Sequence, residues 1–167
     1  MIRQTLRPMV DADLERVLMW RNHPEVRRYM YTQHEITLEE HARWFAKASR
    51  DSARHLLVFE CDDTPLGFVS IHETGRGGVA DWGFYASADA PQGTGRLLGQ
   101  AALRYAFGEA KLHKLCGQVL DYNVRSIRFH ERLGFSQEGV LRQQHYDGQR
   151  YHDVICLGLL LSEWQAV

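Results

Sequence analysis

A glycine-rich turn with the sequence Gln92-Gly93-Thr94-Gly95-Arg96 comes directly before a segment with helical apolar spacing. Such a turn presents free backbone N–H groups at the positive end of a helix dipole, and this arrangement binds phosphate groups. The two glycines let a ligand approach the backbone closely, Thr94 offers a hydroxyl, and Arg96 adds a positive charge. The turn therefore predicts an anion-binding site, and an ordinary turn without a ligand is the alternative.

A second group of residues follows downstream: Asn123-x-x-Ser126, then His130, then Leu133-Gly134-Phe135. Together with the glycine-rich turn, this stretch resembles the coenzyme-binding end of the GNAT acetyltransferase family. The resemblance is most specific between residues 80 and 135, and it extends over the whole chain in the order of the expected elements. It departs from the family pattern at Ala90, where members carry Gln or Arg, and Gln92 or Arg96 is the expected substitute.

The resemblance implies acetyl-coenzyme A as the co-substrate. Its pyrophosphate would lie on the amides of the glycine-rich turn. Its pantetheine arm would lie between two splayed strands, residues 79–85 and 114–120. The residues that the resemblance places on the coenzyme are Phe84, Tyr85, Gln92, Gly93, Thr94, Gly95, Arg96, Asn123, Ser126, Phe129 and His130.

The reaction that the resemblance implies is direct attack of a neutral amine on the acetyl thioester. It needs a base for the amine, N–H groups that polarise the carbonyl, and an acid for the departing thiolate. Many family members carry a tyrosine as this acid where the present chain has His130, and histidine titrates in a suitable range. His130 is therefore the candidate acid, and a histidine that only packs against the coenzyme is the alternative. The candidate bases, none of which stands out, are Ser70, His72 and Asp81.

The segment from Trp20 to Trp44 is rich in arginine, histidine and aromatic residues. Arginine binds phosphate in a bidentate manner and aromatic rings stack on nucleobases, so this composition suits a nucleotide-sugar. A solvated arginine cluster beside a core tryptophan explains the same composition. The segment also resembles the nucleotide-aminosugar acetyltransferases of pseudaminic acid biosynthesis, a pathway to sialic-acid-like sugars often used on flagellin.

That second resemblance implies UDP-4-amino-4,6-dideoxy-N-acetyl-altrosamine as the acceptor, acetylated at its 4-amino group. The residues it places in the acceptor pocket are Arg21, Met30, Tyr31, His41, Trp44 and Tyr85. Two alternatives remain: an acetyltransferase for protein N-terminal amines of the ribosomal type, and a non-catalytic acyl-coenzyme A sensor. The arginines of the segment disfavour a cationic N-terminus as the acceptor.

The spacing of apolar residues predicts the elements that must position these groups. Strands are expected at residues 2–7, 55–61, 67–72, 79–85, 114–120, 135–146 and 151–161. Helices are expected from an Asp11 cap to about residue 22, from the capping box that Thr37 begins to about residue 49, after the glycine-rich turn, and at residues 123–133. The second and third strands would form a hairpin around Asp63-Thr64-Pro65. This order predicts one α/β domain over residues 1–167, with a mixed, mostly antiparallel sheet of about seven strands and helices on both faces.

Composition sets outer limits on function. The chain has 167 residues, 44% hydrophobic and 25% charged, with a net charge of −1, which is ordinary for a soluble domain and favours neither nucleic acid nor an anionic membrane. There is no signal-peptide core and no membrane-length apolar run, so we expect a cytoplasmic protein. The three cysteines are far apart and are expected to be small core residues, without a metal or a disulfide. A homodimer formed through the final strands is an arrangement common in the family.

Overall fold

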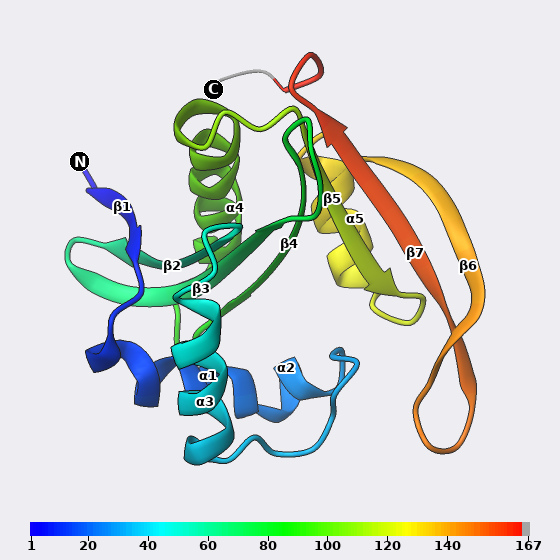
Figure 1. Cartoon of the computed structure of the whole chain (residues 1–167), viewed down its shortest axis with the longest axis horizontal. Helices are drawn as coiled ribbons and strands as arrows, with labels where there is room; N and C mark the ends of the chain where they lie inside the picture. The colour runs from blue at the N-terminus through cyan, green and yellow to red at the C-terminus, as the bar shows by residue number, and fades with distance from the viewer. Residues whose placement is uncertain (165–167) are drawn as a thin grey trace.

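One mixed sheet organises the molecule. In the computed structural model, which describes residues 1–164, seven strands follow the order β1-β2-β3-β4-β5-β7-β6 (Figure 1). The strands are β1 (Gln4–Pro8), β2 (Arg54–Cys61), β3 (Thr64–Glu73), β4 (Val79–Ala86), β5 (Lys114–Leu120), β6 (Ser136–Tyr146) and β7 (Tyr151–Leu160). The helices are α1 (Leu14–Asn22), α2 (Pro24–Arg27), α3 (Leu38–Ala48), α4 (Thr94–Arg104) and α5 (Val124–Arg132), with short turns of helix at Asp11–Asp13 and Tyr105–Glu109.

The sheet opens between β4 and β5, which are its only parallel neighbours in the described part of the chain. These strands pair over three positions, from Val79 with Lys114 to Asp81 with Cys116. Beyond them β4 stays paired with β3 and β5 stays paired with β7, so the two strands diverge into a V (Figure 1). The expected splayed strand pair is thereby confirmed.

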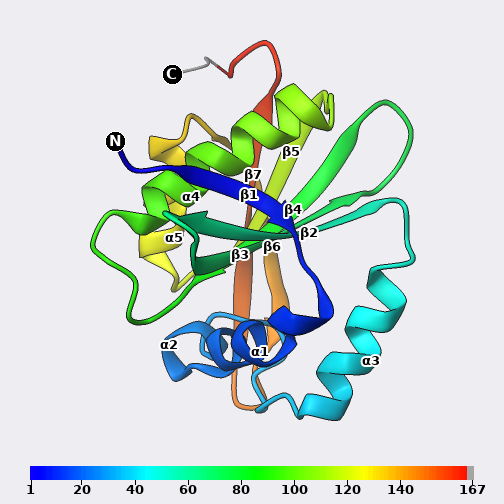
Figure 2. The same cartoon turned by 90° about the vertical axis from the view of Figure 1, so that its left-hand side faces the viewer.

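Helices cover both faces of the sheet, and each face has its own apolar core (Figure 2). Helices α4 and α5 pack on one face, where the buried side chains include Phe59, Ile71, Trp82 and Leu98. Helices α1 and α3 pack on the other face around Val17, Trp20, Phe45, Val58 and Phe68. The expected α/β architecture with two covered faces is confirmed.

Local sequence explains where two of these helices lie. Thr37 and Glu40 form the expected reciprocal capping box at the start of α3: Thr37 N donates to Glu40 Oε2 at 2.8 Å and Glu40 N donates to Thr37 Oγ1 at 3.1 Å. Gly99 lets α4 and α5 approach closely, because a Cβ at this position would lie 2.8 Å from a ring carbon of Phe129 and 2.9 Å from a methyl of Leu133.

The structure differs from the sequence expectations in several places. Helix α2 was not expected; Pro24 begins it, and His23 Nδ1 accepts from the Glu25 amide at 3.2 Å. The first hairpin turns at Asp62-Asp63, both with positive φ, so Thr64 and Pro65 belong to β3 instead of the turn. The cysteines are half-buried free thiols rather than core residues. Within residues 1–164, no cluster of metal-ligating side chains occurs and no helix is long and apolar enough to cross a membrane.

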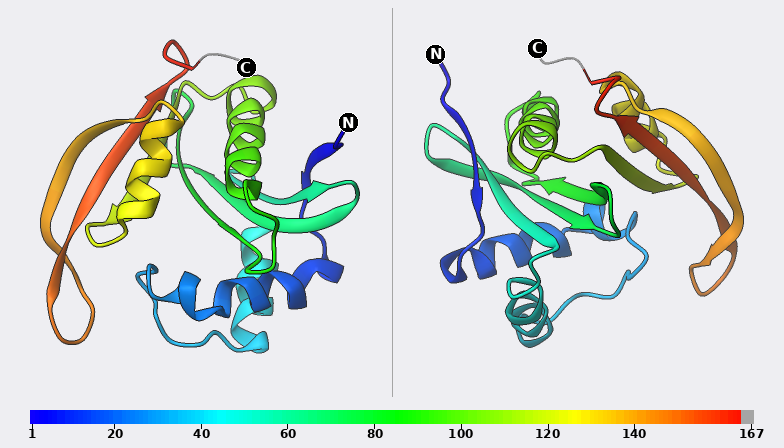
Figure 3. Two further views of the ribbon diagram at one scale, coloured as in Figure 1. Left: turned by 180° about the vertical axis from the view of Figure 1, so that it is seen from behind. Right: turned by 45° about the horizontal axis from the view of Figure 1, so that its top comes forward.

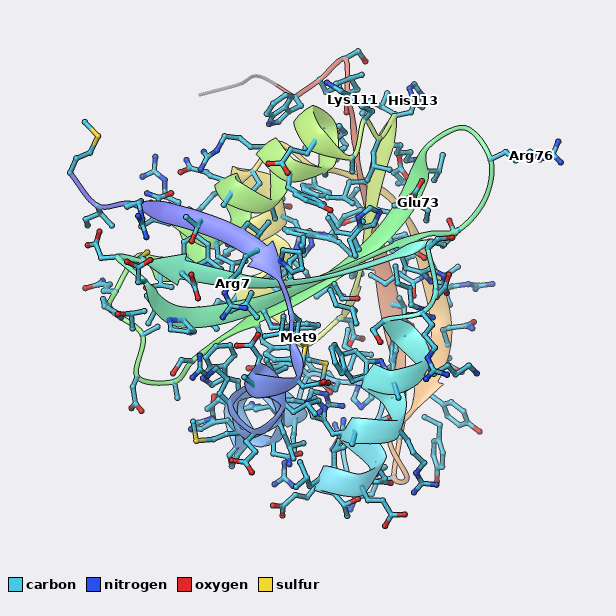
Figure 4. The ribbon with its side chains drawn as sticks, turned by 60° about the vertical axis from the view of Figure 1, so that its left-hand side comes forward. Arg7, Met9, Glu73, Arg76, Lys111 and His113 are labelled. Carbon is cyan, nitrogen blue, oxygen red and sulfur yellow. The ribbon has the colours of Figure 1, made fainter. Side chains whose placement is uncertain are left out.

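The expected cap Asp11 is replaced by Asp13, which is 2% exposed. Asp13 accepts from the Val10 amide at 3.0 Å and receives a bidentate contact from Arg7, at 2.7 and 2.9 Å. Arg7 lies at the end of β1, where the chain turns toward α1 (Figure 4), and its Nε also donates to Glu60 of β2 at 2.7 Å. The Arg7 guanidinium and the Val10 amide hold the pKa of Asp13 below its usual value. This network ties β1, β2 and the start of α1 together.

We expect Asp13→Asn to lower the free energy of unfolding by about 2–3 kcal/mol at pH 7, because the substitution leaves the Arg7 cation without its bidentate partner. A depressed carboxyl pKa stabilises the fold above the unfolded-state value of about 3.9, and that contribution is lost as the pH falls through the folded-state pKa. The gap between wild type and variant in urea unfolding should therefore be full at pH 6 to 7 and should shrink below about pH 4. Asp11→Asn, an exposed change in the same turn, is the control. Equal changes in the free energy of unfolding for Asp13→Asn and Asp11→Asn would contradict the stabilising role of the Asp13–Arg7 contact.

Candidate active site

The glycine-rich turn begins α4, as expected. Gly93 is the residue before the helix and has a φ of 92°, a left-handed conformation that favours glycine. The first backbone bond of α4 runs from Leu97 N to Gly93 O, so the amides of Gly95 and Arg96 precede the ladder and are available to an anion. Thr94 differs from expectation: its hydroxyl and its amide both donate to Pro91 O, at 2.7 and 3.1 Å, and therefore hold the turn instead of facing a ligand.

The second motif forms the N-terminus of α5. Asn123 caps this helix by accepting from the Ser126 amide at 3.3 Å, which leaves its side-chain NH₂ free to donate. Helices α4 and α5 both begin on the side toward which the V between β4 and β5 opens (Figures 1 and 3). The structure therefore brings both sequence motifs to the open end of the V between β4 and β5, as an extended ligand with an anionic end requires.

An aromatic cluster lines the α5 side of the V. The Phe84 ring of β4 lies 5.0 Å from Phe129 of α5 and 4.5 Å from Trp82, measured between centroids. Tyr85, the next residue of β4, points to the opposite face, where it packs against Phe68 at 5.2 Å. The resemblance assigns these two residues to the coenzyme through their backbone groups, and of their side chains only that of Phe84 faces α5.

His130 lies inside this cluster and is 3% exposed. Its Nε2 accepts from Trp82 Nε1 at 3.1 Å, because an indole N–H can only donate, and its Nδ1 therefore carries the proton and donates to Ser126 O at 2.8 Å. Burial lowers the pKa of His130, so the neutral ring is favoured. Gly117 of β5 makes room for the ring, since a Cβ there would lie 2.7 Å from Nε2. Both nitrogens are committed to structural bonds, and this geometry argues against the expected role of His130 as the general acid.

The candidate bases lie on the other face of the sheet. Ser70 pairs with Gly83 and His72 pairs with Asp81 across β3 and β4, so these side chains share the face that carries Tyr85. Asp81 is exposed and belongs to the last pair before the V opens. Asp81 thus stands at the apex of the V, and the Ser70–Gly83 pair lies two positions further along β3 and β4.

Two of the acceptor residues expected from the sequence, His41 and Tyr85, lie near Arg21 of α1. Arg21 Nη2 donates to Thr32 O at 2.9 Å, while Nη1 is buried without a partner among the residues that the structure describes. Burial lowers the pKa of Arg21, partly offset by Tyr85, and nearby Arg27 lowers it further. Burial in turn raises the pKa of Tyr85 well above its usual value, so its hydroxyl stays protonated. His41 is 4% exposed and stacks on Trp44 at 5.2 Å. Met30 follows α2 and is half-buried.

Tyr31 contacts residues of β5 and β6 that sequence reasoning missed. Its hydroxyl donates to Gln118 Oε1 of β5 at 2.9 Å, and its ring lies 5.2 Å from His145 of β6. His145 Nε2 is a further buried nitrogen without a partner in the described part of the chain. Gln118 and His145 come together only through the β5-β7-β6 register, which no local sequence signal reveals. Tyr31 therefore connects the segment after α2 with β5 and β6.

We expect His130→Phe to lower the free energy of unfolding by about 1–3 kcal/mol, because the Trp82 indole N–H is left buried without an acceptor. The rate of the acetyl transfer implied by the family resemblance should fall less than about tenfold, since a lost general acid costs about 10² to 10⁴. Chemical unfolding gives the free energy of unfolding, and single-turnover kinetics on the same preparations give the transfer rate. Trp82→Phe is the matched control, because it removes the indole N–H that donates to His130. If the acetyl-transfer rate of a stably folded His130→Phe protein fell 100-fold or more, His130 would be the general acid after all.

Comparison with known proteins places this geometry in a family. Residues 3–136 match the family model described as "Acetyltransferase (GNAT) domain". The chain is 29% identical over 126 residues to acetyltransferase PseH of Campylobacter jejuni, and the match covers 74% of this chain and 77% of that protein. It is 26% identical over 165 residues to spermidine N(1)-acetyltransferase of Escherichia coli, and this match covers 96% of this chain and 88% of that protein. The structure superposes on spermidine N-acetyltransferase from Vibrio cholerae in complex with CoA and spermine with a TM-score of 0.88, at 25% identity and 96% coverage of both chains. The chain therefore belongs to the GNAT family and is an acetyl-coenzyme A-dependent N-acetyltransferase that acts on an amine.

Proposed function

We propose that the enzyme acetylates the 4-amino group of a UDP-linked 4-amino-4,6-dideoxy sugar, in the biosynthesis of sialic-acid-like sugars such as pseudaminic acid. The observation that carries the proposal is the pair of neighbouring arginine nitrogens, Arg21 Nη1 and Arg27 Nε, that are buried without a partner among the described residues. A buried guanidinium N–H without an acceptor is costly, and a diphosphate supplies several charged acceptor oxygens. These nitrogens therefore suit the phosphates of a nucleotide-sugar.

The aromatic side chains around the arginines support the same class of acceptor. Tyr31 is 51% exposed, which leaves its ring available for stacking, and the stacked pair of His41 and Trp44 lies on the neighbouring helix α3. His41 Nε2 is buried without a partner in the described part of the chain, and burial lowers the pKa of this ring. A neutral imidazole with one free nitrogen suits a hydroxyl or N–H group of a sugar or nucleobase.

The amine to be acetylated would lie at the apex of the V, where the acceptor face meets the coenzyme cleft. There Asp81 would take the proton of the ammonium group directly or through a water molecule, and Ser70 would lie near the amine. The neutral amine would then attack the acetyl thioester without a covalent enzyme intermediate. Positioning of the two substrates on the two sides of the sheet would supply much of the acceleration.

Charge distinguishes this proposal from cationic acceptors. The spermidine acetyltransferases match a larger share of the chain than PseH does, so a polyamine is the second candidate. A polyamine or a protein N-terminus would approach the acceptor side as a cation and would meet the guanidinium groups of Arg21 and Arg27, although Arg27 Nη1 also lies 3.9 Å from Glu35 Oε2. A sensor that binds coenzyme without catalysis would need no acceptor residues at all. A cytoplasmic location and a homodimer stay predictions.

Release of free thiol from acetyl-coenzyme A tests the acceptor class. We expect turnover with UDP-4-amino-4,6-dideoxy-N-acetyl-altrosamine and related UDP-4-aminosugars, and at least 100-fold lower kcat/KM for spermidine and for N-terminal peptides, equivalent to about 3 kcal/mol. Turnover confined to spermidine or peptides would overturn the proposal. Coenzyme binding without turnover of any amine would favour the sensor.

Arg21→Ala tests the phosphate contact. Loss of a charged hydrogen bond is worth about 1.5–3 kcal/mol, so KM for the nucleotide-sugar should rise roughly 10- to 100-fold. The kcat value and KM for acetyl-coenzyme A should change less than about threefold, because the lost contact is remote from the thioester. Arg43→Ala, which removes an exposed arginine of α3 that pairs with Glu39, is the control. An unchanged KM in Arg21→Ala would remove this residue from phosphate binding.

A further inference from the structure

Tyr122 joins two segments that are far apart in the sequence. It lies between β5 and α5, and its hydroxyl donates to Arg28 O at 2.6 Å and accepts from Gln33 Nε2 at 3.3 Å. Its ring stacks on Tyr29, with centroids 5.7 Å apart. These three partners belong to the loop between α2 and α3, residues 28–36, which we name the acceptor loop. Figures 1 and 3 show this loop beside the turn that leads from β5 into α5.

The Tyr122 ring has a second aromatic neighbour. The His152 ring of β7 meets it edge-on, with centroids 4.8 Å apart. His152 in turn lies between two carboxylates, with Nε2 2.7 Å from Asp147 and Nδ1 3.5 Å from Asp121. Burial raises the pKa of Tyr122, so its hydroxyl remains a protonated donor at neutral pH. Tyr122 is thus a rigid support, and the acceptor loop rests on it.

The position of the acceptor loop determines where acceptor-side groups lie. Tyr31 comes from this loop and bonds Gln118, and the carbonyl of Thr32 holds Arg21 at its Nη2. The loop has no regular secondary structure between α2 and the Thr37 cap, so side-chain contacts decide how firmly it is held. Loss of the Tyr122 contacts would therefore loosen Tyr31 and Arg21 together, although Tyr122 touches neither of their ligand-facing groups.

We propose that Tyr122 is a positioning residue that clamps the acceptor loop to the coenzyme half of the molecule and thereby sets the affinity for the acceptor amine. Its neighbour Asn123 caps α5 at the open end of the V between β4 and β5. Tyr122 therefore lies between the proposed acceptor side and the proposed coenzyme site. The nature of the acceptor rests on the proposed function, whereas the clamp itself concerns contacts within the protein.

Tyr122→Phe is the decisive variant, because it keeps the stacking on Tyr29 and the contact with His152 but removes the hydroxyl. With UDP-4-amino-4,6-dideoxy-N-acetyl-altrosamine as the probe, we expect KM for this acceptor to rise about fivefold or more, the equivalent of one ordinary hydrogen bond. The kcat value and KM for acetyl-coenzyme A should change less than twofold. Tyr146→Phe is the matched control, since Tyr146 also donates to a backbone carbonyl, that of Gly148 at 3.0 Å, but within the hairpin turn.

Hydrogen–deuterium exchange gives a readout that requires no acceptor. Amides of residues 28–36 should exchange faster in Tyr122→Phe than in wild type or in Tyr146→Phe, while amides of β5 and α5 should exchange at unchanged rates. Gln33→Ala, which removes the second contact with the hydroxyl, should shift exchange in the same direction. Unchanged exchange of residues 28–36 in Tyr122→Phe would overturn the clamp, and so would an equal rise of both KM values. If residues 28–36 exchange faster in Tyr122→Phe but the wild-type enzyme does not acetylate the UDP-aminosugar, the clamp is supported and only the proposed acceptor is wrong.

Discussion

Strands β4 and β5 share backbone hydrogen bonds over three residue pairs and then separate, each held by its outer neighbour. The separation leaves backbone groups on the facing edges of both strands without a partner strand, and buried groups of this kind require an acceptor or donor from elsewhere. The pantetheine arm of acetyl-coenzyme A carries amides that suit this edge. The starts of α4 and α5, the aromatic cluster and the acceptor side are all arranged around this opening.

The width of the opening is maintained by packing on the α5 side. Gly117, Trp82 and His130 fit together as one unit, in which a missing Cβ on β5 admits an imidazole that bonds the indole of β4. Side chains in a packed interior change position in discrete steps, so such a unit holds the two strands at a fixed separation. His130 thus acts as a spacer between strands, with both nitrogens engaged.

Much of the fold could be predicted from the sequence because its signals are local. The capping box at Thr37, the glycine before α4 and the apolar alternation of the strands each depend on neighbouring residues, and the structure confirms all of them. Two misses are themselves local, namely helix α2, which begins at Pro24, and the first hairpin turn at Asp62-Asp63. The misses at the site depend on contacts between separate elements. Asp13, and not Asp11, accepts from the Val10 amide and also pairs with Arg7 of β1, and the buried bonds of His130 depend on a partner from β4. Gln118, Tyr122 and His145 carried no signal, since only the strand register and the folded loop bring them to the acceptor side.

The two apolar cores lie on opposite faces of the sheet and share no helix. Substitutions in separate, non-contacting clusters add nearly independently in their effects on stability. A lineage can therefore rebuild α1, the acceptor loop and α3 for a new amine while the packing of α4 and α5 around the coenzyme remains intact. This separation gives a physical reason why a chain that is 29% identical to PseH also superposes closely on a spermidine acetyltransferase. The sheet thus allows the packing on one face to change while the packing on the other face is kept.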